Sequence, residues 1–120
     1  MKTLKEQSKK SAAEQRFKRL ARVWKSETEL ISKVSKRIIH PAYQKIIGMG
    51  DAAVPWILMD LAENGPNDWF WALTAITDKN PITKEMAGNM IAMTEAWLAW
   101  GKNAGYLKNC RSLRTLLFRN

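Results

Sequence analysis

The chain has 120 residues, of which 46% are hydrophobic, enough for one domain with a single core. Its single cysteine, Cys110, excludes an internal disulfide and a cysteine-based zinc site, so a reducing compartment is expected. No apolar run approaches the ~18 residues of a membrane helix, and the polar N-terminus lacks the pattern of a signal peptide. These features predict a cytoplasmic protein without a membrane span.

The net charge of +9 is unevenly distributed along the chain. Residues 1–45 carry 13 Lys and Arg against 4 Asp and Glu, residues 46–101 carry 2 against 7, and residues 102–120 carry 5 against none. Two basic segments therefore flank an acidic centre. Either these ends fold back and neutralise the centre, or a basic arm meets phosphate groups or an acidic protein, because charge sign alone names no partner.

Residues 2–25 are predicted to be helical, because they are rich in Ala, Lys, Glu, Gln and Arg and contain no Pro or Gly. One face of this helix is marked by apolar residues at the spacing i, i+3, i+4, i+7, namely Phe17, Leu20, Ala21 and Trp24. The first dozen residues have no such stripe, and a frayed or disordered arm is expected there. The polar side of the helix holds the basic residues Arg16, Lys18, Arg19, Arg22 and Lys25.

The segment that follows is also predicted to be helical. Ser26 and Glu29 have the spacing of a capping box, so a second helix starts there or the first one continues. The helix must end before Pro41, because a residue that precedes proline avoids the helical region. Its apolar face is expected to consist of Leu30, Ile31, Val34 and Ile38.

A short helix is expected to begin at Pro41, whose missing backbone donor costs nothing in a first helical turn. Gly48 or Gly50 should close this helix in a left-handed conformation. Its apolar residues are Ala42, Tyr43, Ile46 and Ile47.

Asp51 is placed to cap the next helix, predicted over residues 52–64. Pro55 is tolerated in its first turn, and the pair Gly65-Pro66 should end it. The buried stripe of this helix is predicted to be Val54, Ile57, Leu58 and Leu61, with Trp56 beside it.

Another short helix should start at Asn67 or Asp68 and run to Thr77. It is apolar on nearly all sides, so it is expected to be the central and most buried element. Its large apolar residues are Trp69, Phe70, Trp71, Leu73 and Ile76. A turn is predicted over residues 78–81, because Asp, Asn and Pro favour turns.

The last strong helix should open at Thr83 or Asn89 and end near Gly101 or Gly105. Its apolar stripe is predicted to be Met90, Met93, Trp97 and Trp100, with Ile91 and Leu98 beside it. Residues 106–120 are either a short amphipathic helix or a loose tail. This region carries a second basic group, namely Arg111, Arg114 and Arg119.

No strand alternation of useful length occurs, so the expected fold is all-α, a compact bundle of five to six short helices. We expect a basic, partly disordered N-terminal helix or arm over residues 1–25. A helical core domain should follow over residues 26–106, and a basic C-terminal tail over residues 107–120.

Two stretches resemble a family of short, uncharacterised bacterial proteins: residues 40–50 (HPAYQKIIGMG) and 69–77 (WFWALTAIT), the latter followed by Asn80-Pro81. Residues 96–101 (AWLAWG) fit the same pattern, and the resemblance covers roughly residues 24–106. It implies a bacterial or phage-type source and supplies no activity. Within it, residues 47–61 resemble the turn and second helix of a HEAT-type repeat, which implies a local helical hairpin at the centre and no solenoid.

No catalytic, cofactor or metal site is predicted. His40 is the only histidine, and beside Pro41 it is expected to cap or pack a helix start, because a general base needs an orienting partner. The Gly48-Met-Gly50 spacing fits neither nucleotide-binding fingerprint. The acidic residues Asp51, Asp68 and Asp78 lie where caps and turns are expected, whereas Asp60 and Glu63 lie one helical turn apart.

The function predicted from these features is that of a non-enzymatic adaptor with a helical protein-binding surface and basic flanks. The setting suggested by small size, family resemblance and basic arm is a bacterial mobile-element, defence or toxin-control system. The aromatic candidates for the surface are Trp56, Trp69 and Trp71. The alternative is direct binding of nucleic acid through the basic N-terminal helix and C-terminal tail.

Overall fold

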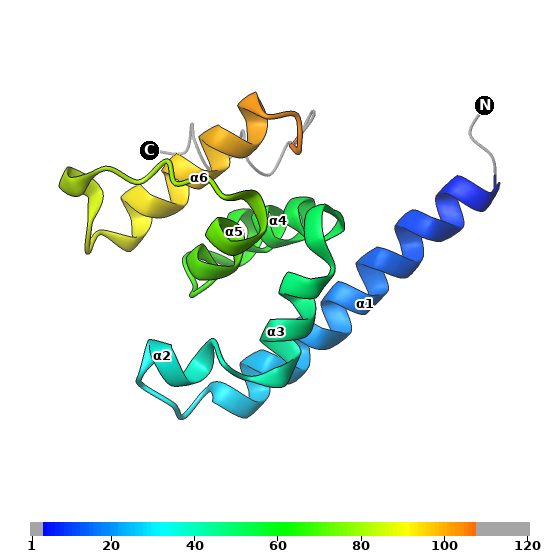
Figure 1. Cartoon of the computed structure of the whole chain (residues 1–120), viewed down its shortest axis with the longest axis horizontal. Helices are drawn as coiled ribbons and strands as arrows, with labels where there is room; N and C mark the ends of the chain where they lie inside the picture. The colour runs from blue at the N-terminus through cyan, green and yellow to red at the C-terminus, as the bar shows by residue number, and fades with distance from the viewer. Residues whose placement is uncertain (1–3, 108–120) are drawn as a thin grey trace. The chain divides into compact units, whose positions relative to one another are not determined.

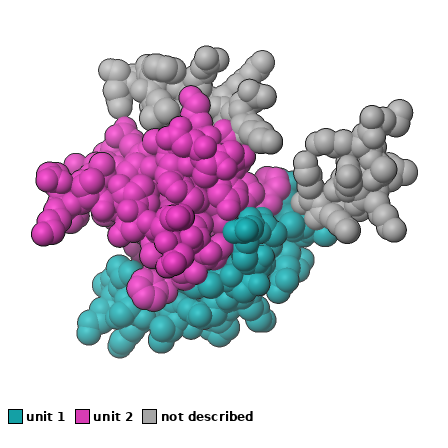
Figure 2. Space-filling view, turned by 45° about the horizontal axis from the view of Figure 1, so that its top comes forward, with its two compact units in different colours: residues 1–53 teal, residues 54–120 magenta. Residues whose placement is uncertain are grey.

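The computed structural model describes the backbone of residues 4–107 and the side chains of residues 12–107. These residues form six α-helices and contain no strand (Figure 1), which confirms the predicted all-α fold of five to six helices. The helices are α1 (Leu4–Thr28), α2 (Val34–Arg37), α3 (Pro41–Gly48), α4 (Val54–Asn64), α5 (Phe70–Thr77) and α6 (Met90–Asn103). The 3-10 segments Gly50–Ala52 and Lys84–Met86 precede α4 and α6. Two compact units divide the chain, Met1–Ala53 (unit 1) and Val54–Asn120 (unit 2), as Figure 2 shows.

Helix α1 runs from Leu4 to Thr28, so it ends three residues beyond the helix predicted over residues 2–25. Its buried face follows the predicted helical spacing, with Phe17, Ala21 and Trp24 buried and Leu20 half-buried. This face packs against α3 within unit 1, and burial of apolar surface between the two helices is what stabilises the pair.

The predicted apolar face beyond Ser26 is wrong. Ser26 lies inside α1, and the helix stops two residues later, so of the two sequence alternatives the first helix continues. Helix α2 is a single turn with no buried residue. Leu30 is 93% exposed and Val34 is 49% exposed. The physical reason is that Trp24 and Thr28 extend the buried stripe of α1 and leave the following aliphatic side chains without a surface to cover them.

Helix α3 confirms the expected start at Pro41, which occupies the first helical position. Ala42, Tyr43 and Ile46 are buried, and Ile47 is half-buried. Gly50 has the left-handed φ of +66° that the sequence required of one glycine, but it begins the 3-10 segment, and Met49 caps the helix instead. Asp51 lies within that 3-10 segment, so α4 begins two residues after the predicted start.

The core of unit 2 is built on α4. Its buried residues include the predicted stripe of Val54, Ile57, Leu58 and Leu61. The helix packs against α6 and against α5. It ends where Gly65 adopts a φ of +87°, as expected of a glycine after a helix.

Two predicted faces in unit 2 need correction. In α5, Ala72 and Leu73 are buried, but Trp71 is 57% exposed, so this helix is not buried on all sides. In α6, Asn89 caps the helix as expected, by accepting a hydrogen bond from the Ala92 N–H. The buried residues of α6 are Thr94, Trp97, Leu98 and Gly101, whereas two members of the predicted face, Met90 and Ile91, are 37% and 65% exposed.

The exposed faces of α5 and α6 have one cause. The spacing of apolar residues in the sequence identifies a helix, but the neighbouring helix decides which of its faces is buried. In α6 that neighbour is Leu58 of α4, whose Cδ1 would lie 2.5 Å from a Cβ added at Gly101. Because of this close approach, Thr94 lies on the covered face of α6 and Ile91 lies on the exposed face.

The expected HEAT-type hairpin stays a prediction, because residues 47–61 lie on both sides of the boundary between the two units. No helix within residues 4–107 combines the length and the apolar composition that a membrane crossing requires.

Candidate functional site

The histidine singled out in the sequence caps α3. The Nδ1 atom of His40 accepts a hydrogen bond from the Ala42 N–H at 3.0 Å, so in the neutral ring the proton is on Nε2. Nε2 lies 2.7 Å from Oε1 of Glu27 and donates to it. Both nitrogens are therefore occupied in holding the start of α3 against α1. The prediction that His40 caps a helix start is confirmed.

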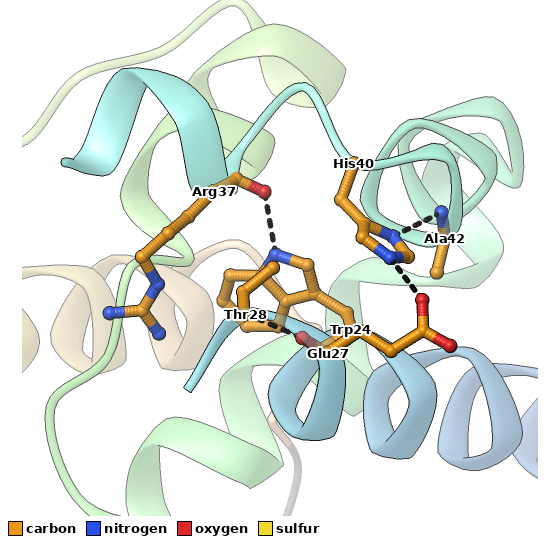
Figure 3. A network of polar contacts seen from close by, with 6 residues as sticks. All are labelled: Trp24, Glu27, Thr28, Arg37, His40 and Ala42. Carbon is orange, nitrogen blue, oxygen red and sulfur yellow. Dashed lines mark hydrogen bonds and ion pairs between the residues drawn. The ribbon is translucent and has the colours of Figure 1, made fainter. Parts of the chain in front are cut away.

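Trp24 forms a second link three residues before Glu27 on α1. Its ring is fully buried, and Nε1 donates a hydrogen bond of 2.8 Å to the backbone oxygen of Arg37. The Arg37 guanidinium lies 5.4 Å from the ring centroid, and the Tyr43 ring lies 5.0 Å away on the α3 side. The Thr28 hydroxyl closes the end of α1 by donating to the Trp24 backbone oxygen. Figure 3 shows the polar interactions around the two links.

The two links hold residues 29–39, which we call the 29–39 segment. At its start the Ile31 N–H donates to the Thr28 oxygen, and at its end the Gln44 side chain donates to the Ile38 oxygen. The segment is thus anchored to α1 and α3 on both sides. It includes α2, which buries none of its own residues.

Aliphatic side chains on the 29–39 segment are exposed. Leu30 has almost its whole surface in solvent, Ile39 is 67% exposed, and Val34 is also exposed. Lys33 and Lys36 are exposed beside them, and Glu29 is the only acidic residue of the segment. Sequence reasoning missed this surface because the same aliphatic residues were assigned to a buried helix face. Neither the Glu27–His40 hydrogen bond nor the Trp24–Arg37 bond leaves a signal in the sequence.

The predicted basic residues of α1 differ in their surroundings. Arg16, Arg19 and Arg22 are exposed at three-residue intervals on the side opposite Phe17 and Trp24, and no ion pair within the described part of the chain involves them. Lys18 is exposed but pairs with Glu14 at 2.8 Å. Lys25 is half-buried. The second basic group, Arg111, Arg114 and Arg119, lies outside the described residues.

The three candidate tryptophans differ in how far they are buried. Trp69 is fully buried and donates from Nε1 to Oδ2 of Asp60 at 2.7 Å, which ties the start of α5 to α4. Trp56 is half-buried, and of the three only Trp71 has most of its surface exposed. The structure therefore leaves Trp71 available for a partner and places Trp69 in the core.

The carboxylates give no catalytic arrangement within the described residues. The other oxygen of Asp60 accepts from the Asn64 side chain at 2.7 Å, so this residue orders the end of α4. The pKa of the Glu85 carboxyl is lowered because it accepts hydrogen bonds from its own backbone N–H and from Thr83. Within residues 4–107 no group of three or more His, Cys, Asp and Glu side chains could hold a metal ion.

Comparisons with protein-family models, curated proteins and solved structures found no match for this chain. The family resemblance and the HEAT-type resemblance therefore stay predictions. An all-α fold does not by itself specify an activity, so only the residues of the site can indicate one.

Proposed function

We propose that this protein is a small, non-enzymatic adaptor that acts in the cytoplasm, and that the 29–39 segment binds a protein partner. The observation that carries the proposal is the exposure of Leu30, Val34 and Ile39 on a segment that is anchored at both ends. Exposed aliphatic groups gathered on one short stretch are typical of interaction surfaces. Because the segment is already held in place, binding loses little conformational entropy.

Basic and apolar groups together on this surface favour one kind of partner. Unit 1 carries 13 Lys and Arg against 5 Asp and Glu, and Lys33 and Lys36 flank the aliphatic side chains. A surface that alternates apolar and basic groups fits a partner with an apolar centre and a rim of Asp and Glu, because complementary charge raises the association rate and selects the partner. The proposed partner is therefore an acidic protein that presents an apolar patch.

Two isoleucines with nearly equal exposure provide the test. Ile39 lies on the 29–39 segment and is 67% exposed, whereas Ile91 lies on α6 of unit 2 and is 65% exposed. The full chain with an affinity tag should capture one stoichiometric acidic protein from a lysate of its own organism. We expect Ile39→Glu to weaken that complex more than about 10-fold, or about 1.4 kcal/mol, because the variant removes an apolar group from the interface and adds a charge that the acidic partner repels.

The matched variant Ile91→Glu should bind the captured protein as the unchanged chain does. Equal binding by Ile39→Glu and Ile91→Glu, or a captured protein without excess Asp and Glu, would contradict the proposal. The absence of any stoichiometric protein would contradict it as well.

A second candidate function is supported by a separate observation. Arg16, Arg19 and Arg22 extend over about 9 Å of α1 at about 1.5 Å per residue, and all three are exposed. Such a row can bind consecutive phosphates of a nucleic acid, with release of bound cations.

A salt series tests this candidate. If the row binds phosphate, the slope of log affinity against log salt for duplex DNA or RNA should fall by about 2 to 3 when all three arginines become alanine. Lys18→Ala is the control, because Lys18 is already paired with Glu14. No binding at about 50 mM salt, where phosphate binding is strong, would exclude the nucleic-acid function.

A further inference from the structure

His40 holds the start of α3 through a hydrogen bond that depends on its protonation state. In the neutral ring Nε2 carries the proton and donates to Glu27, and Nδ1 accepts from the Ala42 N–H at 3.0 Å. A second proton binds at Nδ1, where it turns the acceptor into a donor. The protonated ring therefore cannot cap α3, because two N–H groups would then face each other.

Protonation of this ring costs the fold more than it gains. It strengthens the pairing of Nε2 with Glu27, but the Glu27 side chain is 61% exposed, and an ion pair in water contributes little. The side-chain cap is lost at the same time. The positive charge also lies at the amino end of a helix, where the helix dipole disfavours it. The net effect of acid is therefore to weaken the start of α3.

The charged groups around the imidazole come from three elements. From α1, Glu27 faces it and pairs with Nε2. From the 29–39 segment, Arg37 directs its guanidinium to the Trp24 ring, 5.4 Å from the centroid (Figure 3), and Lys36 is exposed. On α3 the next charged residue is Lys45, which is also exposed. Glu27 is thus the only ion-pair partner of the imidazole within the described residues, and it does not replace the acceptor at Nδ1.

From this geometry we infer that His40 is a pH-sensitive latch: its protonation exchanges the cap of α3 for an ion pair with Glu27 and loosens the end of the 29–39 segment. His40 directly follows that segment, and Gln44 of α3 holds the Ile38 oxygen. Histidine changes its charge between about pH 5 and 8, and His40 is the only histidine of the chain. The consequence for binding rests on the proposed function: the partner is held less well in acid, because the segment is then less preorganised.

The test follows the free, ¹⁵N-labelled full chain by NMR at about pH 7.5 and about pH 5, on either side of histidine titration. At the higher pH the ring nitrogens of His40 should report the neutral form with its proton on Nε2. At the lower pH, the protection of the Ala42 amide against hydrogen exchange, corrected for the intrinsic rate, should fall about 5-fold, as expected for the loss of a helix cap.

The chain supplies its own control, and two variants complete it. Asn89 caps α6 by accepting from the Ala92 N–H, also at 3.0 Å, and does not titrate, so the protection of the Ala92 amide should not change. His40→Asn keeps a capping side chain without a titrating ring, and the Ala42 amide should then be equally protected at both pH values. Glu27→Gln should still lose this protection in acid, because the acceptor that disappears is Nδ1.

Several outcomes would overturn the latch. These are a neutral His40 ring with its proton on Nδ1, unchanged protection of the Ala42 amide in acid, or an equal loss of protection at Ala92 or in His40→Asn. A response that vanishes in Glu27→Gln would assign it to the carboxylate and would overturn the latch as well. Failure to capture an acidic partner counts against the proposed function alone, since the latch is measured in the free chain.

Discussion

Trp24→Ala is expected to destabilise unit 1 by about 3–5 kcal/mol, the usual cost of removing a buried aromatic side chain. Trp24 is fully buried, packs at 5.0 Å on Tyr43 and donates its N–H to the Arg37 oxygen. The truncation therefore removes the packing between α1 and α3 and the link that holds the end of α2. Amide hydrogen exchange of the full chain is the appropriate measurement, because it reports the protection of each unit separately.

Trp24→Phe separates packing from hydrogen bonding. Phenylalanine retains most of the buried ring and removes the donor to Arg37, so we expect a decrease in stability of about 1–2 kcal/mol. Amides of the 29–39 segment should lose protection before those of α1 and α3. Unit 2 should be affected by neither variant. A decrease below about 1 kcal/mol for Trp24→Ala, or equal decreases for both variants, would show that the indole is not the main stabilising group of unit 1.

The short-range features of the fold were predictable from the sequence because local chemistry determines them. Pro41 begins α3 since its backbone lacks a donor, and Gly65 ends α4 since it tolerates a positive φ. Asn89 caps α6 through its side-chain oxygen. The buried stripe of α4 was also predictable, because α5 and α6 both pack against this helix and cover its apolar side.

Exposure was not predictable in the same way. Leu30, Trp71 and Ile91 are apolar residues at helical spacing, and the sequence treats them like Leu61 or Leu73. Whether such a residue is covered depends on packing against residues distant in the sequence. The candidate surfaces are therefore the places where the hydrophobic pattern and the observed burial disagree, as expected where a sequence serves binding as well as folding.

The interactions that hold the 29–39 segment were hidden for another reason. Glu27 and His40 are 13 residues apart, as are Trp24 and Arg37, and both hydrogen bonds form only because a chain reversal brings α3 back along α1. The basic residues Arg16, Arg19 and Arg22 of α1, in contrast, were predicted and are exposed, since charged side chains on the polar side of an amphipathic helix remain in water whichever partner covers the other side.

Gly101→Ala is expected to destabilise unit 2 by about 1–3 kcal/mol, although alanine normally favours a helix over glycine by about 1 kcal/mol. A Cβ at Gly101 would lie 2.5 Å from Cδ1 of Leu58 and 3.3 Å from Cδ1 of Leu107. Leu58 is fully buried and Leu107 is 4% exposed, so either side chain can move only by repacking against its neighbours. The added methyl group must displace the Leu58 side chain or move α6 away from α4.

A double-mutant cycle with Leu58→Ala tests this close approach in unfolding experiments. Leu58→Ala alone should cost about 2–5 kcal/mol as a cavity, and Gly101→Ala should become neutral or stabilising in that background because its methyl group fills part of the space. Gly48→Ala is the control, since Gly48 also lies in a helix but has no atom within 4 Å of the added Cβ, and it should be neutral or slightly stabilising. Additive effects of Gly101→Ala and Leu58→Ala would contradict the close approach, and would leave the register of α6, which exposes Ile91 and buries Thr94, without its physical cause.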